Sequence, residues 1–94
     1  MDQIERIAHM EQIMRRAEAA VQELDRALEA FLAQQEPLRE LEDYYKSALW
    51  LADYDSDSAG LLPPELPRGV LSEDGIYDLL AERDRLLARI RAEE

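Results

Sequence analysis

The sequence predicts an all-α fold, a three-helix antiparallel bundle formed by a single domain over residues 1–94. Two observations support this: apolar residues recur at helical spacing in three separate stretches, and a Pro/Gly-rich segment separates the second stretch from the third. Charged residues make up 35% of the chain and apolar residues 47%, a balance typical of amphipathic helices rather than of a disordered acidic tail.

The first predicted helix covers about residues 2–34 and resembles a coiled-coil helix. Its apolar positions alternate spacings of three and four, as the a and d positions of a heptad do. These positions are Ile7, Met10, Met14, Ala17, Val21, Leu24, Leu28 and Phe31. The flanking e and g positions include Ile4, Ile13, Ala20, Ala27 and Leu32. Because this face is wide for a two-stranded seam, the pattern favours a bundle within one chain over an isolated dimeric coiled coil.

The second predicted helix covers about residues 36–52. Pro37 suits the first turn of a helix, and the apolar positions after it again alternate spacings of three and four. Those positions are Leu38, Leu41, Tyr45, Ala48 and Ala52. Trp50 lies on the far side of this helix from the stripe, so it is expected to be either exposed or covered by something other than the first helix.

Residues 53–71 are predicted to form an ordered Pro/Gly loop. The segment holds two of the three glycines and three of the four prolines, so it cannot be a regular helix. Its apolar residues are too numerous for a solvated linker. They are Leu61, Leu62, Leu66, Val70 and Leu71. We therefore expect the loop to fold back over Trp50 and Tyr54.

The third predicted helix covers about residues 72–92. Ser72 is a good N-cap, and Glu73 and Asp74 complement the positive end of the helix dipole. Leu71 and Ile76 stand where a hydrophobic staple would place them.

Residues 44–80 carry a family resemblance. The elements YYxSxxWxxDY, DxAG, LP and RGVLSEDxIYxLL resemble DUF4298, a family of small bacterial proteins of unknown function. The resemblance implies no activity. It points to shared residues in and around the loop, which together with Tyr45 are our candidate interaction residues: Trp50, Asp53, Tyr54, Asp57, Gly60, Arg68, Gly69, Ser72, Glu73, Asp74 and Tyr77. Pro67 departs from the lysine expected before Arg68.

Asp53, Asp55 and Asp57 match the first, third and fifth positions of a calcium-binding EF-hand loop. The remaining positions fail, because Ser58 replaces the required Gly and Pro64 replaces the closing Glu. We expect instead that Asp53 ends a helix, Asp57 forms a turn and Asp55 is solvated.

Arg68 is surrounded by acids, and we expect an ion pair with Asp53, Asp57 or Glu73 that holds the loop to the helix ends. The alternative is an anion site formed by Arg68 with the beginning of the third helix.

The composition argues against several functions. Cysteine is absent, and the sole histidine, His9, has no neighbour suited to a zinc site or a catalytic triad, so we expect no enzyme activity and no cofactor. The net charge of −11 is spread evenly, with −3 on residues 1–34, −2 on 35–52, −3 on 53–71 and −3 on 72–94, which argues against direct nucleic-acid binding. No stretch is long and apolar enough to span a membrane, and the acidic start MDQIERIAHMEQ is unlike a signal peptide, so we expect a cytoplasmic protein.

The function expected from these observations is a non-enzymatic interaction or scaffolding module that binds another protein, or itself, through a helical face or the loop. A homo-oligomer would form through the 2–34 helix. One alternative is an acidic inhibitor that mimics nucleic acid and blocks a basic partner, although several arginines interrupt the acids. The other alternative is a small metal-binding protein that uses Asp53, Asp55 and Asp57.

Overall fold

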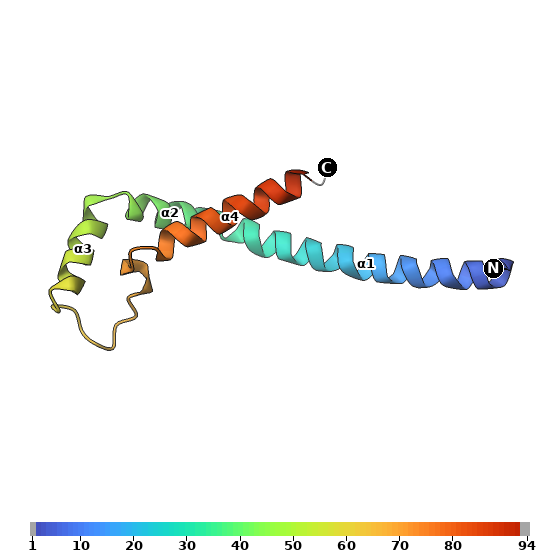
Figure 1. Cartoon of the computed structure of the whole chain (residues 1–94), viewed down its shortest axis with the longest axis horizontal. Helices are drawn as coiled ribbons and strands as arrows, with labels where there is room; N and C mark the ends of the chain where they lie inside the picture. The colour runs from blue at the N-terminus through green and yellow to red at the C-terminus, as the bar shows by residue number, and fades with distance from the viewer. Residues whose placement is uncertain (1, 93–94) are drawn as a thin grey trace. The chain divides into compact units, whose positions relative to one another are not determined.

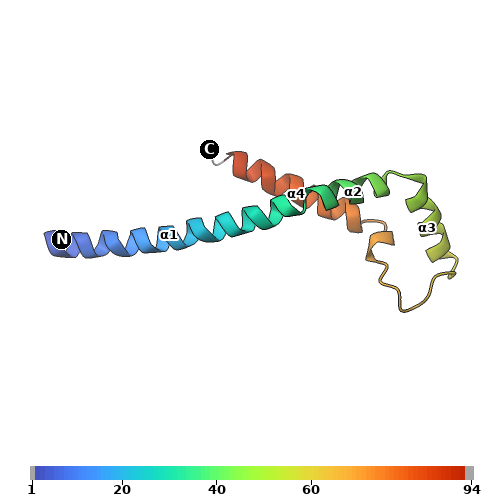
Figure 2. The same cartoon turned by 180° about the vertical axis from the view of Figure 1, so that it is seen from behind.

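A computed structural model describes residues 2–92, and within that range every regular element is a helix. The elements are α1 (Gln3–Ala33), α2 (Gln35–Tyr45), α3 (Ala48–Ser58), the short 3₁₀ helix η1 (Gly69–Leu71) and α4 (Gly75–Ala92) (Figures 1 and 2). The all-α prediction is confirmed. The chain divides into two compact units, residues 1–36 and residues 37–94, and each is described by itself. The single domain and the antiparallel bundle stay predictions.

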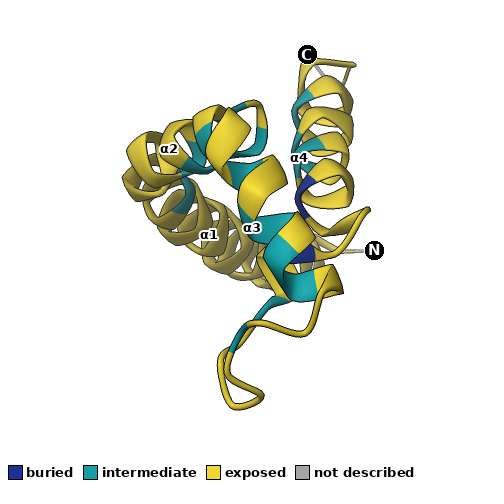
Figure 3. Ribbon diagram, turned by 90° about the vertical axis from the view of Figure 1, so that its left-hand side faces the viewer, coloured by how far each residue is buried: buried dark blue, intermediate teal, exposed yellow. Residues whose placement is uncertain are grey.

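The first unit consists of α1 and the first two residues of α2. Asp2 is the N-cap of α1, and its carboxylate accepts a hydrogen bond of 2.8 Å from the backbone N–H of Glu5. No residue of α1 is buried, and Figure 3 shows the helix almost entirely in the colour of exposed residues. The helix covers Gln3–Ala33, so the predicted range of 2–34 is correct to within one residue at each end.

Pro37 explains why α1 does not continue into α2. In an unbroken helix Pro37 would offer no N–H to the carbonyl of Ala33, and its ring would collide with that carbonyl. The helix instead ends at Ala33, and the backbone N–H of Gln34 donates to the carbonyl of Phe31 at 2.9 Å. Pro37 is the third residue of α2, where a missing N–H breaks no intrahelical bond.

The prediction of one helix over 36–52 was wrong, and Ser47 is the reason. Its hydroxyl donates to the carbonyl of Tyr44 at 2.6 Å and accepts from the N–H of Trp50 at 3.4 Å, so it acts as the N-cap of α3. The backbone of Ser47 is extended, with φ −93° and ψ 161°. The apolar residues from Leu38 to Ala52, which were predicted to form one stripe, therefore lie on two separate helices, α2 and α3.

The prediction that residue 53 begins a loop was also wrong, because α3 runs to Ser58. The helix ends in a Schellman motif. The N–H of Leu61 donates to the carbonyl of Ser56 and that of Gly60 to the carbonyl of Asp57, both at 3.0 Å. Gly60 has φ +72°, a left-handed conformation that favours glycine. The segment without α-helix is therefore residues 59–74, and it contains η1.

The start of α4 lies later than the predicted residue 72. Gly75 is its first residue, and the carbonyl of Asp74 accepts the first helical bond, from Asp78 at 2.8 Å. Ser72 still caps the segment, since its hydroxyl accepts from the N–H of Gly75 at 3.1 Å and donates to the carbonyl of Gly69 at 2.9 Å. Ser72 belongs to the tight Gly69–Ser72 turn, and Glu73 and Asp74, which were predicted to lie in the helix, precede α4.

The core of the second unit is small. Leu71, at the end of η1, is 5% exposed, and Ile76, in the first turn of α4, is 3% exposed. They are the buried residues within the described range and appear dark blue in Figure 3. The later start of α4 means that they do not occupy staple positions. On the same face of α4, Leu80 and Leu87 are half-buried. No helix within residues 2–92 is long and apolar enough to cross a lipid bilayer.

Candidate functional site

Three aromatic rings form a row at the junction of α2 and α3. The ring of Trp50 stacks on Tyr54, with centroids 5.3 Å apart and planes at 24°. Its other neighbour is Tyr45, in an edge-on contact with centroids 5.2 Å apart. The prediction that Trp50 would lie away from Tyr45 was wrong, because it assumed one straight helix. The break at Ser47 turns Trp50 back toward the end of α2.

The loop is tied to this aromatic row by two side-chain hydrogen bonds. The indole Nε1 of Trp50 donates to the carbonyl of Val70 at 2.8 Å, and the hydroxyl of Tyr54 donates to the carboxylate of Glu73 at 3.2 Å. The bond to Glu73 and the charge of that carboxylate raise the pKa of Tyr54. The expectation that the loop folds back over Trp50 and Tyr54 is confirmed.

A second tyrosine joins α2 to α3 directly. The hydroxyl of Tyr44 donates to the carboxylate of Asp53 at 2.6 Å. This hydrogen bond, together with partial burial and the nearby negative charge, raises the pKa of Tyr44. Asp53 was predicted to end a helix. It lies instead in the middle of α3, where it accepts this bond.

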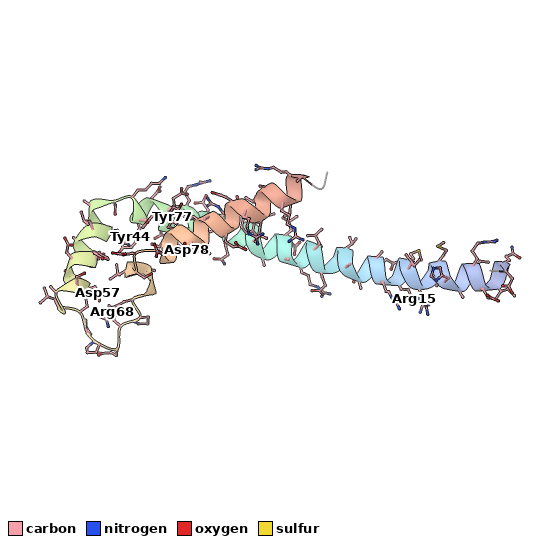
Figure 4. The ribbon with its side chains drawn as sticks, viewed as in Figure 1. Arg15, Tyr44, Asp57, Arg68, Tyr77 and Asp78 are labelled. Carbon is pink, nitrogen blue, oxygen red and sulfur yellow. The ribbon has the colours of Figure 1, made fainter. Side chains whose placement is uncertain are left out.

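Arg68 forms the ion pair expected of it, and its partner is Asp57. The guanidinium Nη1 lies 2.7 Å from the carboxylate of Asp57, and both side chains are about one-third exposed or less. Figure 4 shows the two side by side, Asp57 near the end of α3 and Arg68 on the loop that returns past it. The ion pair holds the loop against the end of α3. It also neutralises the positive charge of Arg68. This favours the structural interpretation over an anion site.

A shallow hollow lies beside these contacts. Its polar lining is Tyr44, Asp53 and Arg68, and its apolar lining includes Leu66 and Leu71. Each of the three polar side chains is engaged with another residue of the unit, Tyr44 with Asp53 and Arg68 with Asp57. The hollow is therefore an apolar surface with satisfied polar groups at its edge.

The three aspartates of the calcium-loop pattern do not converge. They lie on α3, where a spacing of two residues turns successive side chains by about 200°. Asp53 binds the Tyr44 hydroxyl, Asp57 binds Arg68, and Asp55 is exposed. Within residues 2–92 no group of three His, Cys, Asp or Glu side chains is placed to hold a metal ion. The loop that the EF-hand pattern needs is a helix here.

The glycines of the motif have distinct local roles. Gly60 supplies the left-handed residue that ends α3. At Gly75, an added Cβ would lie 2.5 Å from the Ser72 hydroxyl and 2.8 Å from the carbonyl of Gly69. Gly75 therefore allows the turn to pack against the beginning of α4. At Gly69 an added Cβ would meet no atom within 4 Å, so Gly69 has no steric requirement of this kind.

The candidate residues thus separate into two groups. The structure brings together the residues that join α3 to α2 or to the loop, namely Tyr45, Trp50, Asp53, Tyr54, Asp57, Arg68 and Glu73. Tyr77 is 62% exposed and takes no part in these contacts.

Sequence reasoning missed Tyr44 and Ser47. The available signal was a serine three residues before Trp50, a spacing that suits an N-cap.

A family model described as "Domain of unknown function (DUF4298)" matches residues 7–92. The chain belongs to the DUF4298 family. The match includes most of α1 as well as the whole of α2, α3 and α4, so it extends well beyond the 44–80 motif. No curated protein and no solved structure matches the chain.

Proposed function

We propose that this DUF4298 protein is a non-enzymatic, cytoplasmic interaction module whose binding surface is the apolar stripe of α1. One observation carries the proposal. The stripe runs the length of a 31-residue helix, yet none of its residues is buried in its own unit. Val21 is 65% exposed and Leu24 62%, in the middle of the helix. A single helix gains most of its stability from packing an amphipathic face, so such a stripe favours a binding partner.

The second unit supports a structural role for the 44–80 motif rather than a catalytic one. The hydroxyls of Tyr44 and Tyr54, the indole N–H of Trp50 and the guanidinium of Arg68 bind groups within the unit. A catalytic acid, base or nucleophile needs free access to a substrate in a cleft. The hydrogen bonds and the ion pair of the motif instead hold α2, α3 and the loop before α4 together.

The charges on the surface favour this function over mimicry of nucleic acid. A mimic needs an uninterrupted acidic band. Several arginines pair with nearby acids instead: Arg15 with Glu11, Arg26 with Glu23, and Arg85 with Glu82. In Glu82 the pairing with Arg85 lowers the carboxyl pKa. The resulting surface alternates in sign along both α1 and α4.

The test is to place charge in the stripe. The double variant Val21→Glu with Leu24→Glu puts two carboxylates at a and d positions, and Gln22→Glu adds a carboxylate at an outward b position as the control. We expect the double variant to lose binding to its partner by at least about a hundredfold, since burying an unpaired charge costs several kcal/mol. The control should bind normally.

Two measurements check this. Sedimentation equilibrium follows self-association, and affinity capture from the native host with quantitative mass spectrometry follows other proteins. Equal association and equal capture by the double variant and the wild type would contradict the proposal, provided that circular dichroism shows both to be helical.

A further inference from the structure

The identity of the partner follows from the two edges of the α1 stripe, and this inference rests on the proposed function. With Ile7 taken as an a position, the e positions carry Glu11, Glu18 and Asp25, one acid every seven residues. The g positions on the opposite edge carry Ile13, Ala20 and Ala27. Between residues 11 and 27 one edge of the stripe is therefore acidic and the other apolar, while the outermost e positions carry Ile4 and Leu32 and the first g position carries Arg6.

Charge patterns at these edges decide how two such helices pair. In an antiparallel pair, e positions face e positions. When the two helices overlap fully, Glu18 faces Glu18 of the second copy and Glu11 faces its Asp25. Shifting the register by one heptad still leaves Glu11 opposite Glu18. Each of these antiparallel arrangements brings like charges together along an apolar seam, where they repel one another.

A parallel, in-register pair removes these contacts. Each e position then faces the g position five residues earlier on the other helix. Glu11 faces Arg6 of the second copy, an attractive contact that occurs twice by symmetry. Glu18 faces Ile13 and Asp25 faces Ala20, so the acid stems lie along apolar side chains while their carboxylates reach water. Arg6, Glu18 and Asp25 make no side-chain ion pair within the described chain.

The residues at the seam agree with two parallel strands. Ile7 and Val21 are β-branched and occupy a positions, while Leu24 occupies a d position, a combination that favours parallel dimers. No charged residue lies at an a or d position between Ile7 and Phe31. The extra width at the g edge comes mostly from alanines, which are small enough to lie beneath the acid stems of the other helix.

We propose that a second copy of this chain covers the α1 stripe, and that the two α1 helices form a parallel, in-register, two-stranded coiled coil. The seam then covers apolar side chains that are more than half exposed in the single helix. Ile7 is 60% exposed, Met10 56% and Met14 51%. The attractive Arg6 to Glu11 contacts lie at the N-terminal end, and the acidic edges of the two helices lie on opposite sides of the pair.

Because the chain has no cysteine, a single introduced thiol tests the orientation. Met10→Cys places a thiol at a d position. In a parallel pair the two thiols meet across the seam, within the Cα separation of roughly 4.4 to 6.8 Å that a disulfide spans. In the fully overlapped antiparallel pair they are roughly 24 Å apart along the axis. His9→Cys, one residue earlier at an outward c position, is the matched control.

Under mild oxidation we expect Met10→Cys to become a disulfide-linked dimer on a non-reducing gel at least about ten times faster than His9→Cys. Arg6→Glu, which turns both attractive contacts into repulsive ones, should weaken dimerisation about fivefold by sedimentation equilibrium, whereas Arg6→Gln should have a smaller effect. Equal cross-linking rates for the two cysteine variants would overturn the parallel pairing.

The same measurements separate this inference from the proposed function. A wild-type chain that stays monomeric at about 100 µM would overturn the second copy as the partner. If that monomer still captured another protein through a contact that the Val21→Glu and Leu24→Glu variant abolishes, the proposed function would stand and the homodimer would not. A monomer without such a contact would overturn both.

Discussion

The two units of this chain use their side chains in opposite ways. The first unit is one regular helix, stabilised by a cap at Asp2 and by helix propensity, and it buries no residue. The second unit consists of short helices and an irregular loop, joined by bonds between residues that are 9 to 20 positions apart in the sequence. It also holds the two buried residues, Leu71 and Ile76.

This difference shows what each kind of sequence specifies. A long heptad pattern specifies a surface, and the stability of that surface depends on whatever packs against it. The 44–80 motif specifies its own local fold, because its aromatic and charged side chains find their partners within the same unit.

The largest effect on the second unit is expected from Ile76→Ala. Ile76 is 3% exposed, and removing a buried isoleucine side chain costs about 2 to 5 kcal/mol. Trp50, the sole tryptophan, is in the second unit and reports its unfolding by fluorescence in denaturant. Ile7→Ala, at a 60% exposed position of α1, is the control and should leave this transition within about 0.5 kcal/mol. Equal shifts for the two variants would mean that the units do not unfold separately.

Gly75→Ala should destabilise the second unit by about 1 kcal/mol, and by no more than about 2 kcal/mol. Alanine gains about 1 kcal/mol of helix propensity over glycine, but overpacking at a close contact costs about 1 to 3 kcal/mol. The added Cβ would lie 2.8 Å from the backbone carbonyl of Gly69, which cannot rotate away as the Ser72 hydroxyl can. Gly69→Ala is the matched control, because its Cβ meets no atom within 4 Å. A Gly75→Ala variant that is more stable than the wild type would refute the close contact.

Gly60→Ala should cost about 1 kcal/mol. The residue has φ +72°, and a residue with a Cβ is strained in that region by roughly 1 to 2 kcal/mol. A Cβ added at Gly60 would meet no atom within 4 Å, so the loss comes from the backbone alone. Chemical denaturation measures it, and Gly60→Asn should recover part of the loss because asparagine tolerates the left-handed conformation. No recovery with asparagine would argue against this cause.

The smallest effect concerns pH. The hydrogen bond from Tyr44 to Asp53 raises the pKa of the Tyr44 hydroxyl in the folded protein above the usual value of 10.0. A raised pKa means that this stabilisation is fully present below about pH 10 and is lost as the pH rises through the folded-state pKa. We expect Tyr44→Phe to be less stable at neutral pH, with a difference from the wild type that shrinks in alkaline solution. A difference that stays constant up to about pH 12 would contradict the hydrogen bond.

The sequence predicted the regular parts well and the junctions poorly. The heptad stripe and the absence of Gly or Pro placed α1 correctly, because local propensity and periodicity act together there. At Lys46 and Ser47 the apolar spacing continued across a helix break, so periodicity could not reveal it. The DYDSDS segment read as a loop because Asp and Ser favour caps and turns, yet it is helical. Its side chains are held by Tyr44 and Arg68, contacts that no local pattern encodes.

By itself, the sequence determined that the chain is helical, that α1 carries a continuous apolar stripe with one acidic edge, and that the 44–80 motif belongs with DUF4298. These are properties of spacing and residue type, which need no knowledge of distant neighbours. Only the tertiary structure decided where α2 ends and that Arg68 pairs with Asp57. It also showed that Trp50 binds the carbonyl of Val70. The Arg68 and Trp50 contacts depend on residues brought together by the loop, and a hydrogen bond across 20 residues leaves no periodic trace in the sequence.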